Sequence, residues 1–561
     1  MPELKPGFIA NMRALLGEGA DAFFRALEQA PSLALRPHRG FAAAAPFIEG
    51  DVPWAAGGFY LRPGARPGAS IAHWAGAFYL QEASAMLPAA VLAAKPGERV
   101  LDLCAAPGGK SSQIALAMGG EGVLVANEVD ASRARVLAAN LERLGVTNAV
   151  VLNETPARLA ARWPGYFDAV LVDAPCSGEG MFRRDPQSRA QWTDAAPRGC
   201  AKRQADILEA AAEMVRPGGR LVYSTCTFND IENEGSVMAF LQAHAGFALE
   251  SFSLPGLGTS EGGMLRIWPH HVRGDGQFAA LLRRAGGAGD EAGRFSTRVD
   301  DAGRLLAGQI GTAGQFSACG GGIGRALAGH TGTAGQLSTC VDDAGQPLAS
   351  QAGTAGQFCV CGEDAGRGKP AGGIAVPGFG VGRAFAAHPA APIGAWRDAL
   401  AAGRPARRPA KARPGKAAPG PDVAALVREL GGCAVSALPV TPQGARLRLE
   451  GRRLIAMPVD APQTDGLRVI SPGPALLRVE TGRVEPEHAL AMALLPGMAL
   501  REAALTEEEA LAFIAGEALP REGETGWTLA TWEGLPLGWG KQAEGMLKNH
   551  VPKGLRARLH P

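Results

Sequence analysis

Two cysteines stand at the ends of two apolar segments of this chain. Cys176 follows the segment VLVDAP, and Cys226 ends the segment RLVYSTC. The uncharged run Ala169–Val172 is typical of a strand that is buried on both faces, as in a covered parallel sheet. Residues that follow such a strand emerge at the carboxyl edge of the sheet, where open α/β sheets bind their ligands. We therefore expect both cysteines to face one crevice.

A thiolate at this edge could add to an electron-poor ring such as cytosine. Addition of sulfur at carbon 6 turns the ring into an enamine, whose carbon 5 can attack an electrophilic methyl group. The adduct is then released when the proton at carbon 5 is removed and the sulfur departs. One cysteine could attack and the other assist release, and the residues alone leave open which does which. Asp173 would hydrogen-bond the polar edge of the ring. The cytosine must be unpaired or flipped out of a stack.

Other uses of these residue types are structural. A disulfide between Cys176 and Cys226 would occupy the same crevice, but a reducing cytosol disfavours it. The nine cysteines of the chain are expected to be reduced thiols, and no paired CxxC frame predicts a metal site. The remaining cysteine and histidine candidates are expected to be buried, incidental or structural: Cys104, Cys200, His73, His270 and His271.

A glycine-containing loop precedes this region. The loop Cys104–Lys110 (CAAPGGK) joins a short strand, Val100–Leu103, to an expected helix, Ser111–Ala117. Such a loop lets backbone N–H groups and a helix amino terminus approach a ligand closely. The next strand, Gly122–Val129, contains Glu128, whose carboxylate is placed to accept both hydroxyls of a ribose. The segment lacks GxGxxG, which fits a ligand with one ribose and no pyrophosphate.

Alternating strands and helices predict the fold class, a doubly wound and mostly parallel α/β sheet. The further expected strands are Val150–Asn153, Phe167–Asp173 and Gly219–Cys226, with helices at Ala131–Leu144 and Ile231–His244 and an antiparallel pair of Phe247–Phe252 with Gln277–Arg284. On the amino-terminal side we expect helices in Pro6–Gln29, an irregular leader over Leu33–Trp74 and a helix over Ala77–Leu92.

The rest of the chain is less uniform. The string GTAGQ recurs at Gly311, Gly332 and Gly353 with too few bulky apolar residues to bury a core, so a flexible insertion is expected rather than a solenoid. A basic tract, Arg397–Lys416, is read as a solvated linker that could contact nucleic acid. The last segment interleaves basic residues with rings, which suits phosphate neutralisation and base stacking: Lys541, Lys548, Lys553, Arg556 and Arg558, with Trp539 and His550.

The 561 residues carry a formal net charge of +2, which by itself implies no acidic partner. The amino terminus shows no secretory signal, and no stretch reaches the ~18 apolar residues that a membrane span needs. We therefore expect a cytoplasmic protein without a membrane partner.

Four motifs together resemble the Nop/Sun family of RNA cytosine-5 methyltransferases: LDLCAAPGGKSSQIA, the acid Glu128, VDAPCSGEGMFRRDP and YSTCTFNDIENE. The match covers Gly76–Arg284. The tail PLGWGKQAEGMLKNHVPKGLR resembles the carboxyl-terminal, PUA-like RNA-binding part of the bacterial branch that acts on 16S ribosomal RNA.

The resemblance implies a Rossmann-like methyltransferase domain, S-adenosylmethionine as cofactor, and 16S rRNA or the small ribosomal subunit as partner. It implies Cys226 as the nucleophile and Cys176 as the thiol that assists release, with Asp173 beside them. The implied cofactor-binding residues are Cys104, Ala105, Ala106, Pro107, Gly108, Gly109, Lys110, Glu128 and Asp173. Two positions depart from the family pattern: Glu154 or Thr155 stands near the usual adenine-contacting aspartate, and Leu35–His38 reads LRPH where relatives often have an Arg-Val-Asn sequence.

The expected organisation is an RNA-binding leader at 1–75, the methyltransferase domain at 76–284, the repeat insertion at 285–383, the basic linker at 384–421 and a separate α+β or β PUA-like domain at 422–561. Two alternatives stay open. One is the same chemistry on transfer RNA, and the other is a non-catalytic RNA-binding factor for ribosome assembly.

Overall fold

The computed structural model describes residues 2–260, 262–286, 390–402, 422–481 and 483–559. The expected repeat insertion lies outside the described residues from residue 287 on, as does the basic tract beyond residue 402.

The central sheet confirms the predicted α/β fold class. Its strands are β5 (Arg99–Asp102), β6 (Val123–Asn127), β7 (Ala149–Leu152), β8 (Phe167–Asp173), β9 (Val215–Thr225), β10 (Phe247–Leu249), β13 (Met264–Ile267), β14 (Gln277–Arg284) and β19 (Val469–Ser471). They lie in the order β10-β14-β9-β8-β5-β6-β7-β19, and β13 pairs with β14. Strands β5 to β9 are parallel to their neighbours within this group, whereas β14 is antiparallel to both β9 and β10. The carboxyl ends of β5, β6, β8 and β9 therefore share one edge of the sheet.

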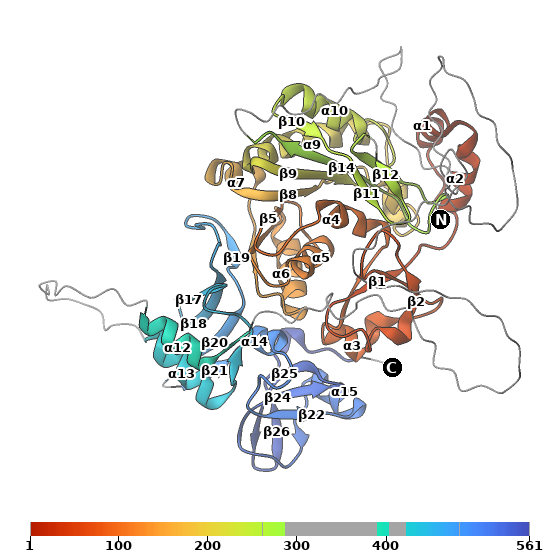
Figure 1. Cartoon of the computed structure of the whole chain (residues 1–561). Coiled ribbons are helices and arrows are strands. Elements are labelled where there is room, and N and C mark those ends of the chain that lie inside the picture. Colours follow the sequence, from red (N-terminus) through yellow and green to blue (C-terminus); the bar gives the residue numbers. More distant parts are fainter. Residues whose placement is uncertain (1, 261, 287–389, 403–421, 482, 560–561) are drawn as a thin grey trace, which may run out of the picture. The chain divides into compact units, whose positions relative to one another are not determined.

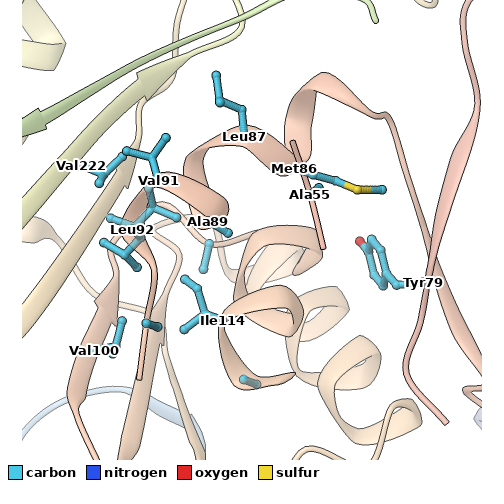
Figure 2. Close-up of a cluster of buried hydrophobic side chains, with 14 of the residues drawn as sticks. Ala55, Tyr79, Met86, Leu87, Ala89, Val91, Leu92, Val100, Ile114 and Val222 are labelled. Atoms are coloured by element: carbon cyan, nitrogen blue, oxygen red, sulfur yellow. The ribbon is translucent and has the colours of Figure 1, made fainter. Parts of the chain in front are cut away.

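Helices cover both faces of this sheet (Figure 1). One face carries α4 (Leu87–Leu92), α5 (Gly109–Met118) and α6 (Ala131–Arg143), and the other carries α7 (Pro156–Arg162), α9 (Ala196–Met214) and α10 (Glu234–Ala243). Each face has its own apolar core. In Figure 2, Val91 of α4 lies beside Val222 of β9, and both side chains are nearly inaccessible to solvent. The apolar strands predicted from the sequence are buried because helices cover both of their faces.

The amino-terminal region is more regular than expected. Helices α1 (Pro6–Leu16) and α2 (Ala20–Leu27) confirm the predicted helical start. The predicted irregular leader is wrong, because β1 (Ala34–Pro37), β2 (Ile48–Asp51) and β3 (Phe59–Leu61) form a sheet in the order β2-β3-β1-β4. Its last strand, β4 (Phe78–Gln81), replaces the first part of the helix expected over Ala77–Leu92. Consecutive Phe78 and Tyr79 are both buried, so their apolar spacing did not mark one helical face.

The carboxyl-terminal region holds two further sheets. One sheet has the order β17-β18-β20-β21, with β17 (Ala445–Glu450), β18 (Arg453–Pro458), β20 (Ala475–Glu480) and β21 (Arg483–Pro486), and it lies against α13 (Val423–Cys433) and α14 (His488–Ala493). The other has the order β22-β24-β25-β26-β23, with β22 (Glu502–Ala504), β23 (Leu519–Pro520), β24 (Gly526–Trp532), β25 (Leu535–Ala543) and β26 (Met546–Asn549). Helix α15 (Glu507–Ala515) packs on this sheet, and a capping box of Thr506 with Glu509 starts the helix.

Short elements complete the description. Within the predicted linker, α12 (Ile393–Ala402) contacts α13, and Trp396 is buried in the same apolar core. The others are α3 (Ile71–Trp74), α8 (Pro186–Gln191), the pair β11 (Phe252–Leu254) with β12 (Gly258–Ser260), and the pair β15 (Ala391–Pro392) with β16 (Ala437–Leu438).

Candidate active site

The structure brings the two cysteines together. Cys176 follows β8 and Cys226 follows β9, and these neighbouring strands are parallel. Their Sγ atoms lie 3.4 Å apart, and both are free, half-buried thiols. The hydrogen bond with Cys226, and then burial, raise the pKa of Cys176 well above its usual value. Cys176 is therefore held as a thiol while Cys226 lies beside it.

Each of the two loops that carry these cysteines has a buried carboxylate that accepts hydrogen bonds from the backbone of the other loop. Glu179, on the Cys176 loop, accepts hydrogen bonds from the backbone N–H groups of Phe228 (2.8 Å) and Asn229 (3.0 Å) on the other loop. In return, Glu232 accepts a hydrogen bond from the backbone N–H of Ser177 at 3.0 Å. Both carboxylates are almost completely buried. Each loop therefore fixes the backbone of the other, and together they set the separation of the two sulfurs.

A close backbone approach supports the same arrangement. The N–H of Gly180 donates to the carbonyl of Cys226 at 2.8 Å, and a Cβ at position 180 would lie 2.7 Å from that oxygen. A side chain at this position would therefore push the loops apart. Behind them, rings of α1 and α2 pack against Phe182 and Phe228, so the helical start of the chain supports both loops.

Replacing Glu232 by glutamine is expected to loosen the Cys176 loop. Its carboxylate accepts hydrogen bonds from Ser177 N, Gln204 Nε2 (2.8 Å) and Asn229 Nδ2 (2.8 Å). Glutamine replaces one of the two carboxylate oxygens by an NH2 group, which would face these N–H groups and cannot accept from them. We expect Glu232→Gln to lower the free energy of unfolding in urea by about 1–3 kcal/mol. The matched control is Asp230→Asn, which changes an exposed carboxylate on the Cys226 loop, the loop that also carries Glu232. An equal, small effect of both substitutions would contradict this role.

Asp173 is held from three directions at the end of β8. Its Oδ2 lies 2.7 Å from Lys110 Nζ, and its Oδ1 accepts from Ser224 Oγ (2.7 Å) and Gln277 Nε2 (3.1 Å). Burial lowers the pKa of Lys110, but the carboxylate of Asp173 and the nearby Cys226 raise it more, so the net shift is upward. The sequence predicted Lys110 and Asp173 but missed Ser224 and Gln277, because the pairing of β14 with β9 was needed to place Gln277.

The loop Cys104–Lys110 leads from β5 into α5 as predicted. Gly108 has φ = +111°, in the left-handed region that favours glycine, and its added Cβ would lie 3.2 Å from Leu137 Cδ1. The leader supports this turn, because Arg36 donates to Gly109 O at 3.0 Å and to Ser112 Oγ at 2.7 Å. Arg36 is 1% exposed, so this arginine of the LRPH segment supports α5 and does not lie at the surface. Cys104 is half-buried within the loop, and burial raises the pKa of its thiol.

The two acids after β6 and β7 differ in their surroundings. The Glu128 carboxylate accepts from Asp130 N at 3.0 Å and pairs with Arg133 at 3.2 Å. Glu154 is fully buried; its carboxylate accepts from Arg468 N at 2.7 Å and pairs with Arg158 at 3.0 Å. Thr155 is exposed at the start of α7. Glu154 therefore holds the segment next to β19, which pairs with β7.

A buried carboxyl group that sequence reasoning missed lies among these residues. Asp102 ends β5; its Oδ2 accepts from Ser111 Oγ at 2.6 Å, and its Oδ1 is buried without a hydrogen-bond partner among the described residues. Burial, together with the charges of Asp173 and Glu128, raises its pKa to about 7. The signal in the sequence was an acid within the apolar strand LDL. Asp173 and Glu128 each pair with a cation, whereas the oxygen of Asp102 that is unpartnered within the described part of the chain suits a ligand that carries positive charge.

The raised pKa of Asp102 predicts a pH-dependent stability. In the unfolded chain this carboxyl loses its proton near pH 3.8, the ordinary pKa of an aspartate, whereas in the folded chain it does so near 7. Stability is therefore lost as pH rises through this interval. Between pH 5 and 8 the loss from this group is on the order of 3 kcal/mol. Asp102→Asn is expected to flatten the decline of Tm over this range in cofactor-free protein, and the exposed Asp206→Asn to leave it unchanged. Parallel declines in both variants would contradict the prediction.

The other candidates lie outside this arrangement. Burial lowers the pKa of His73 and of His270 to about 4 and also lowers that of His271, which leaves neutral rings. In the described part of the chain, no group of three or more His, Cys, Asp or Glu residues is arranged to hold a metal ion. None of the described helices has the length and apolar character to cross a bilayer. Trp539, expected to stack on bases, is 1% exposed and donates to Glu487 O at 3.1 Å, so this expectation is wrong.

Four family models match the chain in order. "N-terminal domain of 16S rRNA methyltransferase RsmF" matches residues 4–83, and "16S rRNA methyltransferase RsmB/F" matches residues 89–283. "RsmF rRNA methyltransferase first C-terminal domain" matches residues 434–494, and "Methyltransferase RsmF PUA domain" matches residues 501–557.

Curated relatives match part of the chain. Proteins named ribosomal RNA small subunit methyltransferase F are 42% identical over 248 residues in Pectobacterium atrosepticum and 44% identical over 245 residues in Vibrio parahaemolyticus. Each alignment covers 42% of this chain and 51% of the relative, so the chain spans about half the length of the curated relatives it matches.

Solved structures include a methyltransferase homologue from Pyrococcus horikoshii, 31% identical, with a TM-score of 0.43 over 49% of this chain and 94% of that one. Another is NSun6 from the same organism with SFG, 22% identical, with a TM-score of 0.45 over 50% and 98% of the two chains.

The family models confirm the resemblance that the sequence motifs indicated. They occur in one order and together span more than half of the chain, so it belongs to the family described as 16S rRNA methyltransferase RsmB/F.

Proposed function

We propose that this protein transfers a methyl group from S-adenosylmethionine to carbon 5 of a cytosine in 16S rRNA, through a covalent adduct with Cys226. The observation that carries the proposal is the 3.4 Å separation of the sulfurs of Cys176 and Cys226 at the ends of parallel strands. The ion pair of Lys110 with Asp173 lies at the same edge of the sheet.

The residues at this edge fit the proposed cofactor. S-adenosylmethionine carries a sulfonium and, when bound, supplies an electrophilic methyl group. The backbone of Cys104–Lys110 and the amino end of α5 offer N–H groups, and Glu128 follows the neighbouring strand to accept ribose hydroxyls. The buried, unpartnered Oδ1 of Asp102 and the carboxylate of Asp173 suit positive charge. These residues would hold the cofactor.

Cys226 is assigned the role of nucleophile because of what surrounds it. The thiolate is the reactive form of a cysteine. The ammonium of Lys110 interacts electrostatically with Cys226 and is held in place by Asp173. In the proposed step, the Cys226 sulfur bonds to carbon 6 of cytosine, and carbon 5 gains the electron pair that attacks the methyl group. Asp173 would hydrogen-bond the polar edge of the ring.

Cys176 is assigned the release step. Its hydrogen bond with Cys226 is the largest cause of its raised pKa, so bonding of the Cys226 sulfur to carbon would remove that cause. Cys176 could then ionise and take the proton from carbon 5. The electron pair of that bond restores the double bond between carbons 5 and 6, and the Cys226 sulfur leaves.

Mapping 5-methylcytosine in RNA from cells with and without this protein tests the proposal. We expect a cytosine of 16S rRNA to lose its methyl group in the deletion strain and to regain it when purified protein and S-adenosylmethionine are added. Loss from transfer RNA instead would favour the alternative substrate. Unchanged methylation in both RNA pools would leave only the non-catalytic alternative.

A further inference from the structure

A cavity of about 260 Å³ lies in the carboxyl-terminal region, and it shares no lining residue with the cysteine crevice. Its walls come from β18, β20, β21, the start of α14, β24 and the segment after β26. Drug-sized ligands occupy sites of about 300–1,000 Å³, so this cavity suits a smaller group. The lining residues used below are Arg453, Arg478, Glu487, His488, Trp527 and His550.

Positive charge faces outward around this cavity. The guanidinium Nε of Arg453 lies 2.9 Å from Glu487 Oε1, and that of Arg478 lies 3.9 Å from the same oxygen. The arginine side chains are 57% and 44% exposed, whereas the side chain of Glu487 is 16% exposed. Arg478 also lies 3.3 Å from Glu480 Oε1 and 3.6 Å from Oε2 of Glu485, which lines the cavity as well. These carboxylates hold the two arginines in place, and the exposed parts of both guanidinium groups are open to a phosphate group.

Two rings line the same cavity as these cations. The rings of Trp527 and His550 are 4.6 Å apart at 75°, and Lys541 Nζ is 5.6 Å from the centre of the Trp527 ring. His550 is exposed, whereas Trp527 is 7% exposed and packs against the His550 ring. Burial lowers the pKa of His488 to about 4, so this lining ring is neutral at physiological pH. Exposed rings next to cations are the combination that binds single-stranded nucleic acid.

We propose that this cavity binds one unpaired nucleotide of the RNA substrate, with its base against His550 and its phosphate on Arg453 and Arg478. The inference rests on the proposed function, in that the ligand is RNA. It adds an anchoring site whose residues take no part in the chemistry, so RNA affinity and adduct formation can be measured separately.

The test uses the full chain and a fluorescein-labelled single-stranded RNA of twelve mixed-sequence nucleotides, followed by fluorescence anisotropy in increasing KCl. His550→Ala is expected to weaken Kd by about 5- to 150-fold, since stacking of one base contributes roughly 1–3 kcal/mol. His550→Phe, which keeps a ring, is expected to restore most of the affinity. The paired change Arg453→Ala and Arg478→Ala is expected to weaken Kd and to reduce the salt slope by about 1.

The matched control is Arg452→Ala, an exposed arginine that pairs with Glu480 and does not line the cavity. It is expected to bind RNA like the unchanged protein. Inorganic polyphosphate, as a charge-only competitor, should bind the unchanged protein and His550→Ala with the same inhibition constant if only the base contact is lost. Wild-type affinity of folded His550→Ala, or equal effects of Arg452→Ala and the paired variant, would overturn the nucleotide site.

Adduct trapping at saturating RNA separates this inference from the proposed function. Cys176→Ala combined with His550→Ala should still form the covalent adduct once RNA is saturating, which supports both. If no adduct forms with any variant but the ring-dependent affinity remains, the proposed chemistry fails while the nucleotide site stands.

Discussion

Cys226→Ala is expected to lower methylation of 16S rRNA by about 10³-fold or more, because the proposed covalent route to an activated carbon 5 is lost. RNA binding should remain within about twofold of the unchanged protein, since one sulfur atom contributes little to a contact dominated by phosphate charge. The measurement is transfer of a radiolabelled methyl group to RNA, with anisotropy for binding.

The control for this result is Cys433→Ala. This half-buried thiol is remote in sequence and belongs to helix α13, which packs on another sheet. The control variant should keep full activity. Product formation by Cys226→Ala at the rate of this control would show that Cys226 is not the nucleophile. Loss of RNA binding together with activity would instead indicate that the substitution disturbs the fold.

Cys176→Ala is expected to trap the protein on its RNA. Attack by Cys226 survives in this variant, but proton removal from carbon 5 loses its proposed base, so release should slow by about 10²-fold or more. A band of protein joined to labelled RNA should therefore appear on a denaturing gel. Its yield should depend on added S-adenosylmethionine.

The double variant, Cys176→Ala with Cys226→Ala, should give no such band, because the sulfur that bonds to the base is absent. A band in the double variant would place the bond on another residue. Rapid turnover by Cys176→Ala without accumulation of the adduct would refute its role in release. The 3.4 Å contact of the two sulfurs makes the two variants strongly interdependent, so their effects are not expected to add.

The strands of the central sheet could be predicted because they are composed almost entirely of apolar residues, which indicates that they are buried. The expected strand Phe167–Asp173 matches β8 in full, and the Cys104–Lys110 loop leads into α5 as predicted. A run without charge has to be covered on both faces, so sequence alone indicated the parallel sheet and the edge at which its ligand-facing residues stand.

The errors arose where apolar spacing has two interpretations. Phe78 and Tyr79 fit a helical pattern, but they belong to β4, which completes the leader sheet by pairing with β1. Trp539 stands among basic residues in the sequence, but it belongs to β25 and its side chain is buried in the apolar core of the carboxyl-terminal region. Strand pairing and burial decide these cases, and both depend on residues far away in the chain.

The sequence by itself determined the α/β sheet, the loop after β5 and the positions of two cysteines at strand ends, since the apolar composition of a segment and the direction of the chain are local properties. Only the tertiary structure decided that Glu179 and Glu232 lock the two cysteine loops together and that Gln277 reaches Asp173. It also revealed Asp102 as a buried carboxyl among other carboxylates. Hydrogen bonds and electrostatic interactions act over a few ångströms in space, whereas residues that make them can be far apart in the chain, as Asp173 and Gln277 are, at 104 positions.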